Sequence, residues 1–466
     1  MTVAERAAEL AEKKLADIQV ADARPPEFSD EALALRFAER HADDLRYVAA
    51  WGRWLRWDGA RWASDDTLYA FDIARAVCRV AAASAEKPHI KTALASAKTV
   101  AATVRLAKAD RRLAATVGQW DRDIWLLNTP DGVVDLRTGD VRAHRPDDYV
   151  TLITAVGPGA DCPTWLTFLA EVTDGDAELQ GFLQRLAGYV LSGSIREHCL
   201  AFLYGTGANG KSVFVNALAG VLGGYHKSAP IETFTASHTD HHPTDLAMLR
   251  GARLVTAVET EAGRRWAESR IKMLTGGDRI AARFMRQDFF EFTPTFKLLV
   301  AGNNKPGLRS VDEAIRRRFH LIPFVVTIPP AKRDLDLGDR LRREWPGILA
   351  WAIRGCLAWQ RDGLMPPVVV RDATATYLEG QDAIGAWIDD ACARDYDAWE
   401  SQAALFASWK AWATRAGEFV MSRARFLDLL ETRGFARHRQ GGTGSRGILG
   451  LRVVKHDADD AWRGRP

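Results

Sequence analysis

Apolar residues recur at helical spacing over four stretches of this chain of 466 residues. The stretches are 28–43, 67–117, 163–192 and 373–416, and their periodicity predicts helices with one buried face. Between the last two, apolar residues instead dominate short stretches over 200–204, 253–259 and 296–301. Such runs predict buried strands. The pattern therefore indicates an α/β core behind a mixed, mainly helical N-terminal region.

Turn signals predict two small β-hairpins before the core. Asp58-Gly59 lies between alternating flanks, and Asp131-Gly132 and Thr138-Gly139 punctuate 124–142. Arginines and stacking aromatics surround the first turn, and they could bind single-stranded nucleic acid. Alternation also explains them as the hairpin's own small core, which is the simpler interpretation. The members of this patch are Arg46, Tyr47, Trp51, Arg53, Trp54, Arg56, Trp57, Arg61 and Trp62.

Composition limits the classes of protein that fit. The hydrophobic fraction of 47% and charged fraction of 26% are those of a globular protein, and the net charge of +3 requires any nucleic-acid surface to be local. The five cysteines are scattered without C-x-x-C spacing, as expected for reduced thiols. No run reaches membrane-spanning length and no signal peptide is seen, so we expect a cytoplasmic protein without a membrane partner.

The phosphate-binding pattern G-x-x-x-x-G-K-[ST] occupies 205–212, between a predicted strand and a predicted helix. Its glycines allow successive backbone N–H groups to face a phosphate, and the helix N-terminus adds its dipole. Lys211 would reach the β- and γ-phosphates of ATP, and the Ser212 hydroxyl would bind Mg²⁺. The residues predicted to bind the cofactor are Gly205, Thr206, Gly207, Ala208, Asn209, Gly210, Lys211, Ser212 and Val213.

The later strands end in polar residues. Glu259 and Glu261 end the second strand, where one carboxylate could hold Mg²⁺ and the other orient the attacking water. Asn303 follows the third strand and could contact the γ-phosphate, although Asn-Asn also forms turns. Arg317 and Arg318 belong to a run of three arginines that could reach a neighbour's γ-phosphate, although a solvated face would explain one or two of them.

A local basic excess lies between these strands. Residues 264–297 contain eight Arg and Lys against four Asp and Glu. The stretch 283–290 reads as a hairpin with Arg286 near its tip, and Lys272 stands before a second expected hairpin, Thr275-Gly276-Gly277-Asp278. A separate cluster, 238–242, holds three histidines and an aspartate, but its proline-marked loop without cysteines makes a metal site the weaker interpretation.

The C-terminal part reads as helix, helix and a glycine-tipped hairpin, the order of a winged helix. Ser422 is a suitable N-cap for a helix through Arg433, and the tryptophans of 373–416 fit a core better than base stacking. From Met421 to Lys455 there are eight Arg and Lys against two Asp and Glu, which suits DNA phosphates. A winged helix that contacts protein is the alternative.

Taken in order, these motifs resemble the superfamily 3 helicases, and more narrowly the phage and plasmid primase–helicase family related to the poxvirus primase–helicase. The resemblance extends upstream to 127–139 and Gly188-Tyr189, and downstream to 344–351. It implies an AAA+-like P-loop ATPase core in a homo-hexameric ring that hydrolyses ATP with Mg²⁺ between subunits and translocates on single-stranded or forked DNA.

The resemblance also implies roles for single residues. Glu259 and Glu261 would coordinate Mg²⁺ and activate the attacking water. Thr260 separates these two acids, which are often adjacent in the superfamily. Asn303 is the sensor, and Arg317 or Arg318 is the finger. The hairpin residues that grip DNA are Lys272, Arg283 and Arg286.

We therefore predict a replicative helicase of a phage, prophage or plasmid in a bacterial cytoplasm, working with a replication initiator or primase and lacking a primase domain of its own. The alternatives are a non-unwinding initiator or regulator that uses ATP only to assemble on DNA, and another AAA+-type motor. The predicted parts are an N-terminal tail (1–27), a hairpin with helices (28–118), a helicase-associated domain (119–195), the ATPase core (196–362) and a winged-helix domain (370–466).

Overall fold

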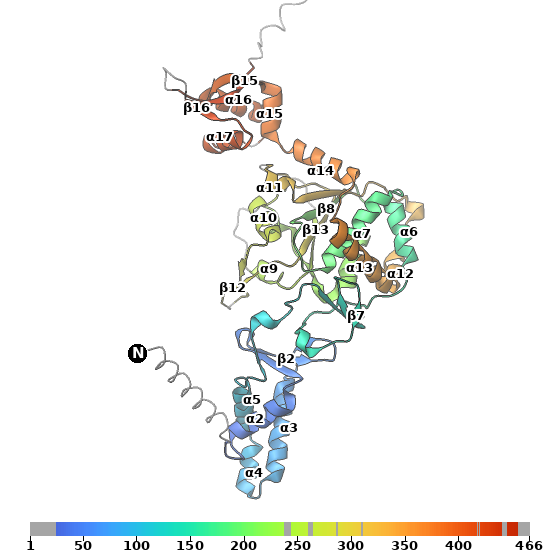
Figure 1. Ribbon diagram of the computed structural model, residues 1–466, viewed down its shortest axis with the longest axis vertical. Coiled ribbons are helices and arrows are strands. Elements are labelled where there is room, and N and C mark those ends of the chain that lie inside the picture. Colours follow the sequence, from blue (N-terminus) through green and yellow to red (C-terminus); the bar gives the residue numbers. More distant parts are fainter. Residues whose placement is uncertain are drawn as a thin grey trace, which may run out of the picture.

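The computed structural model describes residues 25–236, 244–259, 264–285, 288–308, 311–416, 418, 420–439 and 445–454, without the side chains of Glu259 and Thr432. Three parts follow one another along the long axis of the molecule (Figure 1). A helical N-terminal unit lies at one end, an α/β core in the middle, and a small C-terminal unit at the other end. The predicted N-terminal tail falls almost wholly outside the described residues.

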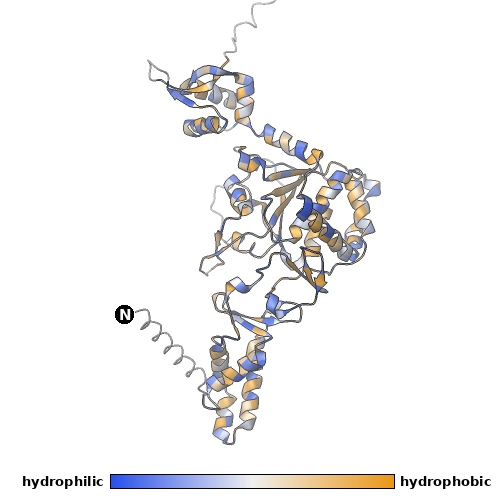
Figure 2. Ribbon diagram, in the orientation of Figure 1, coloured by the Kyte–Doolittle hydropathy of each residue, from blue (hydrophilic) through white to orange (hydrophobic). Residues whose placement is uncertain are grey.

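The N-terminal unit packs four helices against a four-stranded sheet. The helices are α2 (Asp30–His41), α3 (Tyr69–Ser84), α4 (Pro88–Leu94) and α5 (Ala97–Ala107). The sheet has the order β3-β2-β1-β4, with β1 (Leu45–Val48), β2 (Arg53–Trp57), β3 (Trp62–Ser64) and β4 (Ala114–Ala115). Figure 2 shows hydrophobic and hydrophilic residues side by side on each of these helices, as expected of helices that bury one face.

The predicted hairpin at Asp58-Gly59 is confirmed, because β2 and β3 pair antiparallel around this turn. Trp54 and Trp62 are buried, and the indole of Trp62 donates to the carbonyl of Pro146 at 2.8 Å. These two rings therefore form part of the core, as the simpler interpretation required. Trp51, in the 3₁₀ turn η1 (Ala49–Trp51), is only half-buried.

A second small sheet and two helices join the N-terminal unit to the core. The antiparallel sheet is β5 (Leu126–Thr129), β6 (Gly132–Asp135) and β7 (Val141–Arg142), and the helices are α6 (Pro163–Val172) and α7 (Ala177–Leu191). Helix α7 packs closely on α13 (Trp345–Asp362), since a Cβ on Gly188 would lie 2.0 Å from the backbone nitrogen of Cys356. These elements share one hydrophobic core with the central sheet, so the structure shows no break at the predicted 195/196 boundary.

The central sheet is parallel throughout, in the order β14-β8-β13-β10-β9. Its strands are β8 (Leu200–Tyr204), β9 (His226–Ser228), β10 (Leu254–Glu259), β13 (Lys297–Gly302) and β14 (Phe319–Pro323). All six residues of β13 are buried, which is why its sequence is a continuous apolar run after Lys297. The three strands predicted from such runs are confirmed. Helix α8 (Lys211–Leu222) follows β8.

Shorter elements complete the core: α9 (Thr244–Ala247), α10 (Glu268–Gly276), β11 (Ile280–Ala282), β12 (Phe290–Phe292), α11 (Glu313–Arg316) and α12 (Leu337–Arg343). The remaining 3₁₀ turns are η2 (Val117–Gln119), η3 (Pro146–Asp148), η4 (Gly223–Tyr225), η5 (Ile231–Thr233) and η6 (Pro330–Lys332). The hairpin predicted over 283–290 is confirmed with other bounds, since β11 and β12 pair antiparallel over 280–282 and 290–292 and residues 283–289 connect them. The prediction that Thr275-Gly276-Gly277-Asp278 forms a hairpin is wrong: it ends α10, with Gly277 in the left-handed conformation at φ 86°.

Helix α14 (Val368–Gly380) extends the core rather than opening the C-terminal unit, where the boundary at 370 had placed it. The Thr374 hydroxyl accepts from the backbone N–H of Leu321 in β14 at 2.9 Å, and the Tyr377 hydroxyl donates to the carbonyl of Pro306. In Figure 1 the helix leads from the core to the C-terminal unit.

The C-terminal unit has its own hydrophobic core. Its elements are α15 (Ala383–Ala391), β15 (Cys392–Ser401), α16 (Gln402–Arg415), α17 (Arg423–Thr432), β16 (Arg437–Arg439) and β17 (Arg446–Val453), with the antiparallel sheet in the order β15-β17-β16. Ser422 caps α17 as predicted, and Trp387 and Trp409 are fully buried, which confirms their place in a core. Among the described residues, no helix has the length and apolarity needed to cross a membrane.

Candidate functional site

The loop between β8 and α8 is built from backbone that only glycine accommodates easily. Gly207 and Gly210 have φ values of 108° and 83°, in the left-handed region. A Cβ on Gly210 would lie 2.5 Å from Cγ1 of Val172, and one on Gly205 would lie 2.0 Å from the carbonyl oxygen of Phe324. The glycines therefore let this loop curl tightly against α6 and the segment after β14.

Lys211 and Asn303, predicted from separate motifs, are in contact. The Lys211 amine donates to the carbonyl of Gly205 at 2.8 Å, to Oδ1 of Asn209 at 2.9 Å and to Oδ1 of Asn303 at 3.1 Å. The side chain is 6% exposed, and burial lowers the pKa of its amine. Asn209 is itself held, because its amide donates to the carbonyl of Phe324 at 2.8 Å.

A cavity of about 550 Å³ opens beside this lysine. It is lined by the loop, by the first turn of α8 including Ser212, and by the ends of β10 and β13. Seven of the nine residues predicted to bind the cofactor line it: Gly207, Ala208, Asn209, Gly210, Lys211, Ser212 and Val213. The N-terminus of α8, a lysine and a hydroxyl thus converge on one space, an arrangement suited to an anion such as a phosphate with its metal ion.

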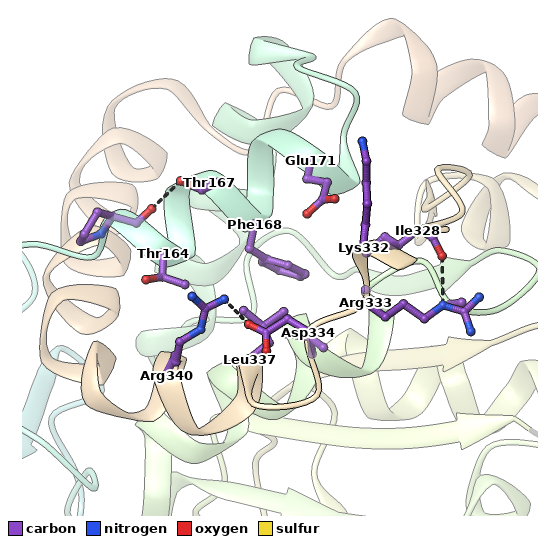
Figure 3. A pocket seen from close by; sticks show the side chains of 14 residues that line it. Thr164, Thr167, Phe168, Glu171, Ile328, Lys332, Arg333, Asp334, Leu337 and Arg340 are labelled. Atoms are coloured by element: carbon purple, nitrogen blue, oxygen red, sulfur yellow. Dashed lines mark hydrogen bonds and ion pairs between the residues drawn. The ribbon is translucent and has the colours of Figure 1, made fainter. Parts of the chain in front are cut away.

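A second cavity of about 490 Å³ adjoins the first and shares Ala208, Gly210 and Val213 with it. In Figure 3 the Phe168 ring projects from α6 toward the segment that carries Lys332, Arg333 and Asp334. The remaining lining residues are Pro163, Thr164, Thr167, Glu171, Ile328, Leu337 and Arg340.

Two contacts shape this second cavity. Arg340 forms an ion pair with Asp334, and the Arg333 guanidinium donates to the carbonyl of Ile328 at 3.0 Å. An aromatic ring, aliphatic side chains and polar groups together could hold a flat heterocycle adjoining the phosphate loop. Sequence reasoning missed this cavity, because its other two walls, over 163–171 and 328–340, lie more than 150 residues apart and carry no motif.

The acids at the end of β10 are only partly described. The backbone of Glu259 pairs with Gly302, which places it at the same sheet edge as Asn303 and the loop. Its side chain and the whole of Glu261 lie outside the described residues. Their separate roles therefore stay a prediction.

The two candidate finger arginines differ in their surroundings. Arg318 is 6% exposed; its guanidinium donates to Oγ1 of Thr275 at 3.1 Å and to the carbonyl of Ala314 at 2.7 Å. Its own carbonyl accepts from the backbone N–H of Leu200, at the amino end of β8. Arg317 is exposed. Arg318 is therefore held within the chain, whereas Arg317 lies at its surface.

The three residues predicted to grip DNA do not form one set. Lys272 lies on α10 and pairs with Asp312, which caps α11 by accepting from the backbone of Ile315 at 2.8 Å. Burial alone raises the pKa of Asp312, but hydrogen bonds from Lys272 and Ile315 bring it below its usual value. Lys272 thus anchors α11 rather than projecting from the hairpin, because 275–278 is a helix end.

Arg283 stays at the predicted hairpin, exposed, with its guanidinium 4.7 Å from the centroid of the Phe289 ring. Arg286, at the expected tip, lies outside the described residues, as does the histidine cluster of 238–242. Within the described part of the chain, no group of three or more His, Cys, Asp or Glu could hold a metal ion.

Comparisons with known families match two stretches of the chain. Residues 34–174 match the family described as D5 N terminal like, and residues 203–318 match a family of unknown function, DUF5906. The first covers the N-terminal unit with the small sheet and α6, and the second covers the glycine-rich loop before α8, the β11–β12 hairpin and α11.

Proteins of large DNA viruses are similar in sequence. "Putative helicase L207/L206" of Acanthamoeba polyphaga mimivirus is 27% identical over 295 residues, which is 58% of this chain and 31% of that protein. "Putative helicase 022R" of Frog virus 3 (isolate Goorha) is 25% identical over 272 residues, 53% of this chain and 28% of that protein. The chain thus covers less than one third of the length of either relative.

Among solved structures, the apo structure of the NrS-1 C terminal region matches with a TM-score of 0.52 and 10% identity, over 90% of this chain and 98% of that one. At this identity the match shows the fold alone. Together with the family matches and the viral relatives, it confirms the resemblance to the primase–helicase family.

Proposed function

We propose that this chain, a relative of the viral helicases that carries a D5 N terminal like region, is an ATP-dependent DNA helicase with an AAA+-like P-loop core. The observation that carries the proposal is the convergence of Lys211 and Asn303 beside a cavity at the carboxyl edge of a parallel sheet. Ligands of open α/β sheets bind at this edge. The names of the viral relatives support the activity.

Nucleotide binding exchanges one set of contacts for another. The phosphates lie against the loop and the N-terminus of α8, and the Lys211 amine turns from Asn209 and Asn303 to the β- and γ-oxygens. Asn303 is thereby released to contact the γ-phosphate or the attacking water. Ser212, at the first turn of α8, is placed to hold Mg²⁺, with a carboxylate at the end of β10. A Mg²⁺ ion held by these residues would offset the negative charge of the phosphates.

The nucleobase enters the second cavity, beside Phe168 (Figure 3). The two cavities share lining residues, so one nucleotide can span both, with its phosphates in the first and its base in the second. The Phe168 ring offers a stacking surface, and polar side chains of the cavity, such as Glu171 and Arg340, orient the base.

Hydrolysis is completed in trans in a homo-hexameric ring. Strand β8 separates the phosphate loop at its carboxyl end from Arg317 near its amino end, and five residues of strand span about 15 Å. Arg317 therefore faces away from its own site, where a neighbouring subunit's γ-phosphate can meet it. This placement at the opposite sheet edge supports assignment of the finger to Arg317.

Two regions contact DNA in this proposal. The β11–β12 hairpin leads directly into β13 and Asn303, so a change at the γ-phosphate can be transmitted to the hairpin. The C-terminal unit, with the element order α15, β15, α16, α17, β16 and β17, is proposed to be a winged helix that binds phosphates independently of nucleotide.

The deciding experiment measures ATP turnover with and without single-stranded DNA, unwinding of a forked duplex, and the mass of the assembly. We expect DNA-stimulated turnover, strand separation and a six-subunit mass. ATP binding and assembly on DNA without strand separation would instead favour the alternative of a non-unwinding initiator or regulator.

A further inference from the structure

A third cavity, of about 400 Å³, lies where the N-terminal unit meets the core. From the N-terminal unit it receives Trp51 and Arg53, and from the core it receives Lys227 of β9, Arg250 and Phe284. Ala247 and Met248, at the end of α9, complete it. Its size is within the range of ligand pockets in proteins.

Charge in this cavity is one-sided. Arg53, Lys227 and Arg250 line it, and no carboxylate is among its lining residues. The adjoining cavity, which shares Trp51 and Arg250, contains Asp121, whose carboxylate accepts from the backbone N–H of Thr151 at 2.8 Å. Asp121 can balance Arg250, but it leaves the other two cations facing the space. Cations gathered without acids attract an anion.

Aromatic surface is presented beside these cations. The Arg250 guanidinium lies 5.0 Å from the Trp51 ring centroid and 5.3 Å from that of Phe290, so it holds the two units together by cation–π contacts. Phe284 stacks on Phe290 with centroids 5.7 Å apart and is still 37% exposed. Met248, Met285 and Phe289 nearby are 55%, 70% and 60% exposed. Apolar side chains left in water beside a cationic cavity indicate an unfilled binding surface.

We infer that this junction cavity is a base-stacking site for single-stranded DNA, in which an unpaired base packs against Trp51 and Phe284 and its phosphate meets Arg53 and Lys227. Aromatic faces beside a basic groove are the combination by which proteins hold single strands without sequence preference. Duplex DNA does not offer the face of a stacked base. The inference extends the proposed function and rests on it for the direction of strand movement.

The site lies between two units, and the hairpin shift proposed above would change its width. Phe284 follows β11, whose partner β12 leads into β13 and Asn303, whereas Trp51 and Arg53 belong to the N-terminal unit. A shift of the hairpin therefore changes the space between the rings. The affinity for single-stranded DNA should accordingly differ between the nucleotide-free protein and the protein with a non-hydrolysable ATP analogue.

The test uses the full chain and the fluorescence anisotropy of a labelled thymidine oligonucleotide, with variants Arg53→Ala and Phe284→Ala. Matched controls are Arg56→Ala, an exposed arginine of the same strand that lies over Tyr69 instead, and Tyr396→Ala, a 94% exposed aromatic of the C-terminal unit. Each cavity variant should weaken binding about fivefold or more, and neither control should. Arg53→Ala should also reduce the slope of log affinity against log salt by about one.

An abasic oligonucleotide separates stacking from charge. On it the effect of Phe284→Ala should vanish, while that of Arg53→Ala should persist, because only the phosphates remain. Cavity variants that bind the thymidine strand as tightly as the wild type would overturn the inference and leave the helicase proposal standing. Conversely, a wild-type chain that binds single strands through these residues but never separates a forked duplex would overturn the helicase proposal and support the cavity assignment.

Discussion

The two edges of the central sheet each bury a lysine, and the two lysines are held in different ways. At the carboxyl edge, Lys211 donates to two side-chain amides and one carbonyl and borders a cavity. Lys297 begins β13 at the amino edge. Its amine donates to the carbonyls of Ser192 and Ser194 and lies 4.7 Å from the Tyr189 ring centroid. One lysine has partners that can rotate away, and the other has only fixed backbone and a ring.

This difference separates a cation available to a ligand from one that belongs to the fold. The Lys211 amine can exchange the side-chain oxygens of Asn209 and Asn303 for phosphate oxygens, since the Asn209 amide keeps its bond to the carbonyl of Phe324 and Asn303 faces the cavity. The carbonyls around Lys297 end α7 and the following turn, so their release would leave backbone acceptors buried and unpaired. Arg253 behaves like Lys297, donating to the carbonyls of Leu191 and Leu126.

The largest expected effect is that of Lys211→Ala. ATP hydrolysis should fall by orders of magnitude, because the positive charge that faces the β- and γ-phosphates is removed. The melting temperature should stay near that of the wild type. Steady-state phosphate release and thermal unfolding, measured on the same preparation, check both halves. Wild-type turnover in this variant would show that Lys211 is not a ligand-binding lysine, and it would contradict the proposed function.

Arg317 is an exposed arginine at the amino edge, and unlike Lys297 it should affect catalysis rather than stability. Arg317→Ala should bind ATP and keep its stability but hydrolyse about 10³-fold more slowly, because a finger stabilises the charge of the transition state. Arg316→Ala, its exposed neighbour, is the matched control and should turn over normally. Arg318→Ala should mainly lower the melting temperature, since its guanidinium joins α11 to α10.

Mixing Arg317→Ala with Lys211→Ala protein tests whether this arginine acts across subunits. Some interfaces in the mixture combine an intact loop with an intact finger, so activity should exceed that of either variant alone. A mixture that never does so would place the finger elsewhere.

Local patterns were sufficient for the glycine-rich turn before α8, the buried strands and the cap at Ser422, because each depends on neighbours in sequence. They were insufficient where distant segments decide. The cavity beside Phe168 joins α6 to the segment around Asp334, and nothing local marks either. Thr275-Gly276-Gly277-Asp278 was misread because glycine at positive φ ends helices as well as it turns hairpins. Three consecutive arginines likewise do not reveal which one packs inward.

The next prediction concerns Lys297, the lysine buried at the amino edge of the sheet. Lys297→Met should lower the free energy of unfolding by about 2 kcal/mol, because carbonyls at the end of α7 lose their donor without gaining water. The KM for ATP should stay unchanged, in contrast to Lys211→Ala. Chemical denaturation measures the first and steady-state kinetics the second. A normal stability with a raised KM would reverse the roles assigned to the two edges.

The smallest effect distinguishes the two lysines by pH. Burial lowers the pKa of Lys297 well below its usual value, so between the folded and unfolded pKa values the unfolded chain binds the extra proton. Stability contributed at this site should therefore rise as pH rises toward the unfolded pKa, near 10.4, and be lost as pH falls through the folded one. The difference in unfolding free energy between wild type and Lys297→Met should grow by at most about 1.4 kcal/mol from pH 8 to pH 9.

Burial also lowers the pKa of Lys211, but its amine borders a cavity, so Lys211→Ala should give the same sign with a shallower slope. Parallel pH profiles for the wild type and Lys297→Met would show that Lys297 does not titrate differently in the folded chain, and that the amino edge is not the closed environment described for it.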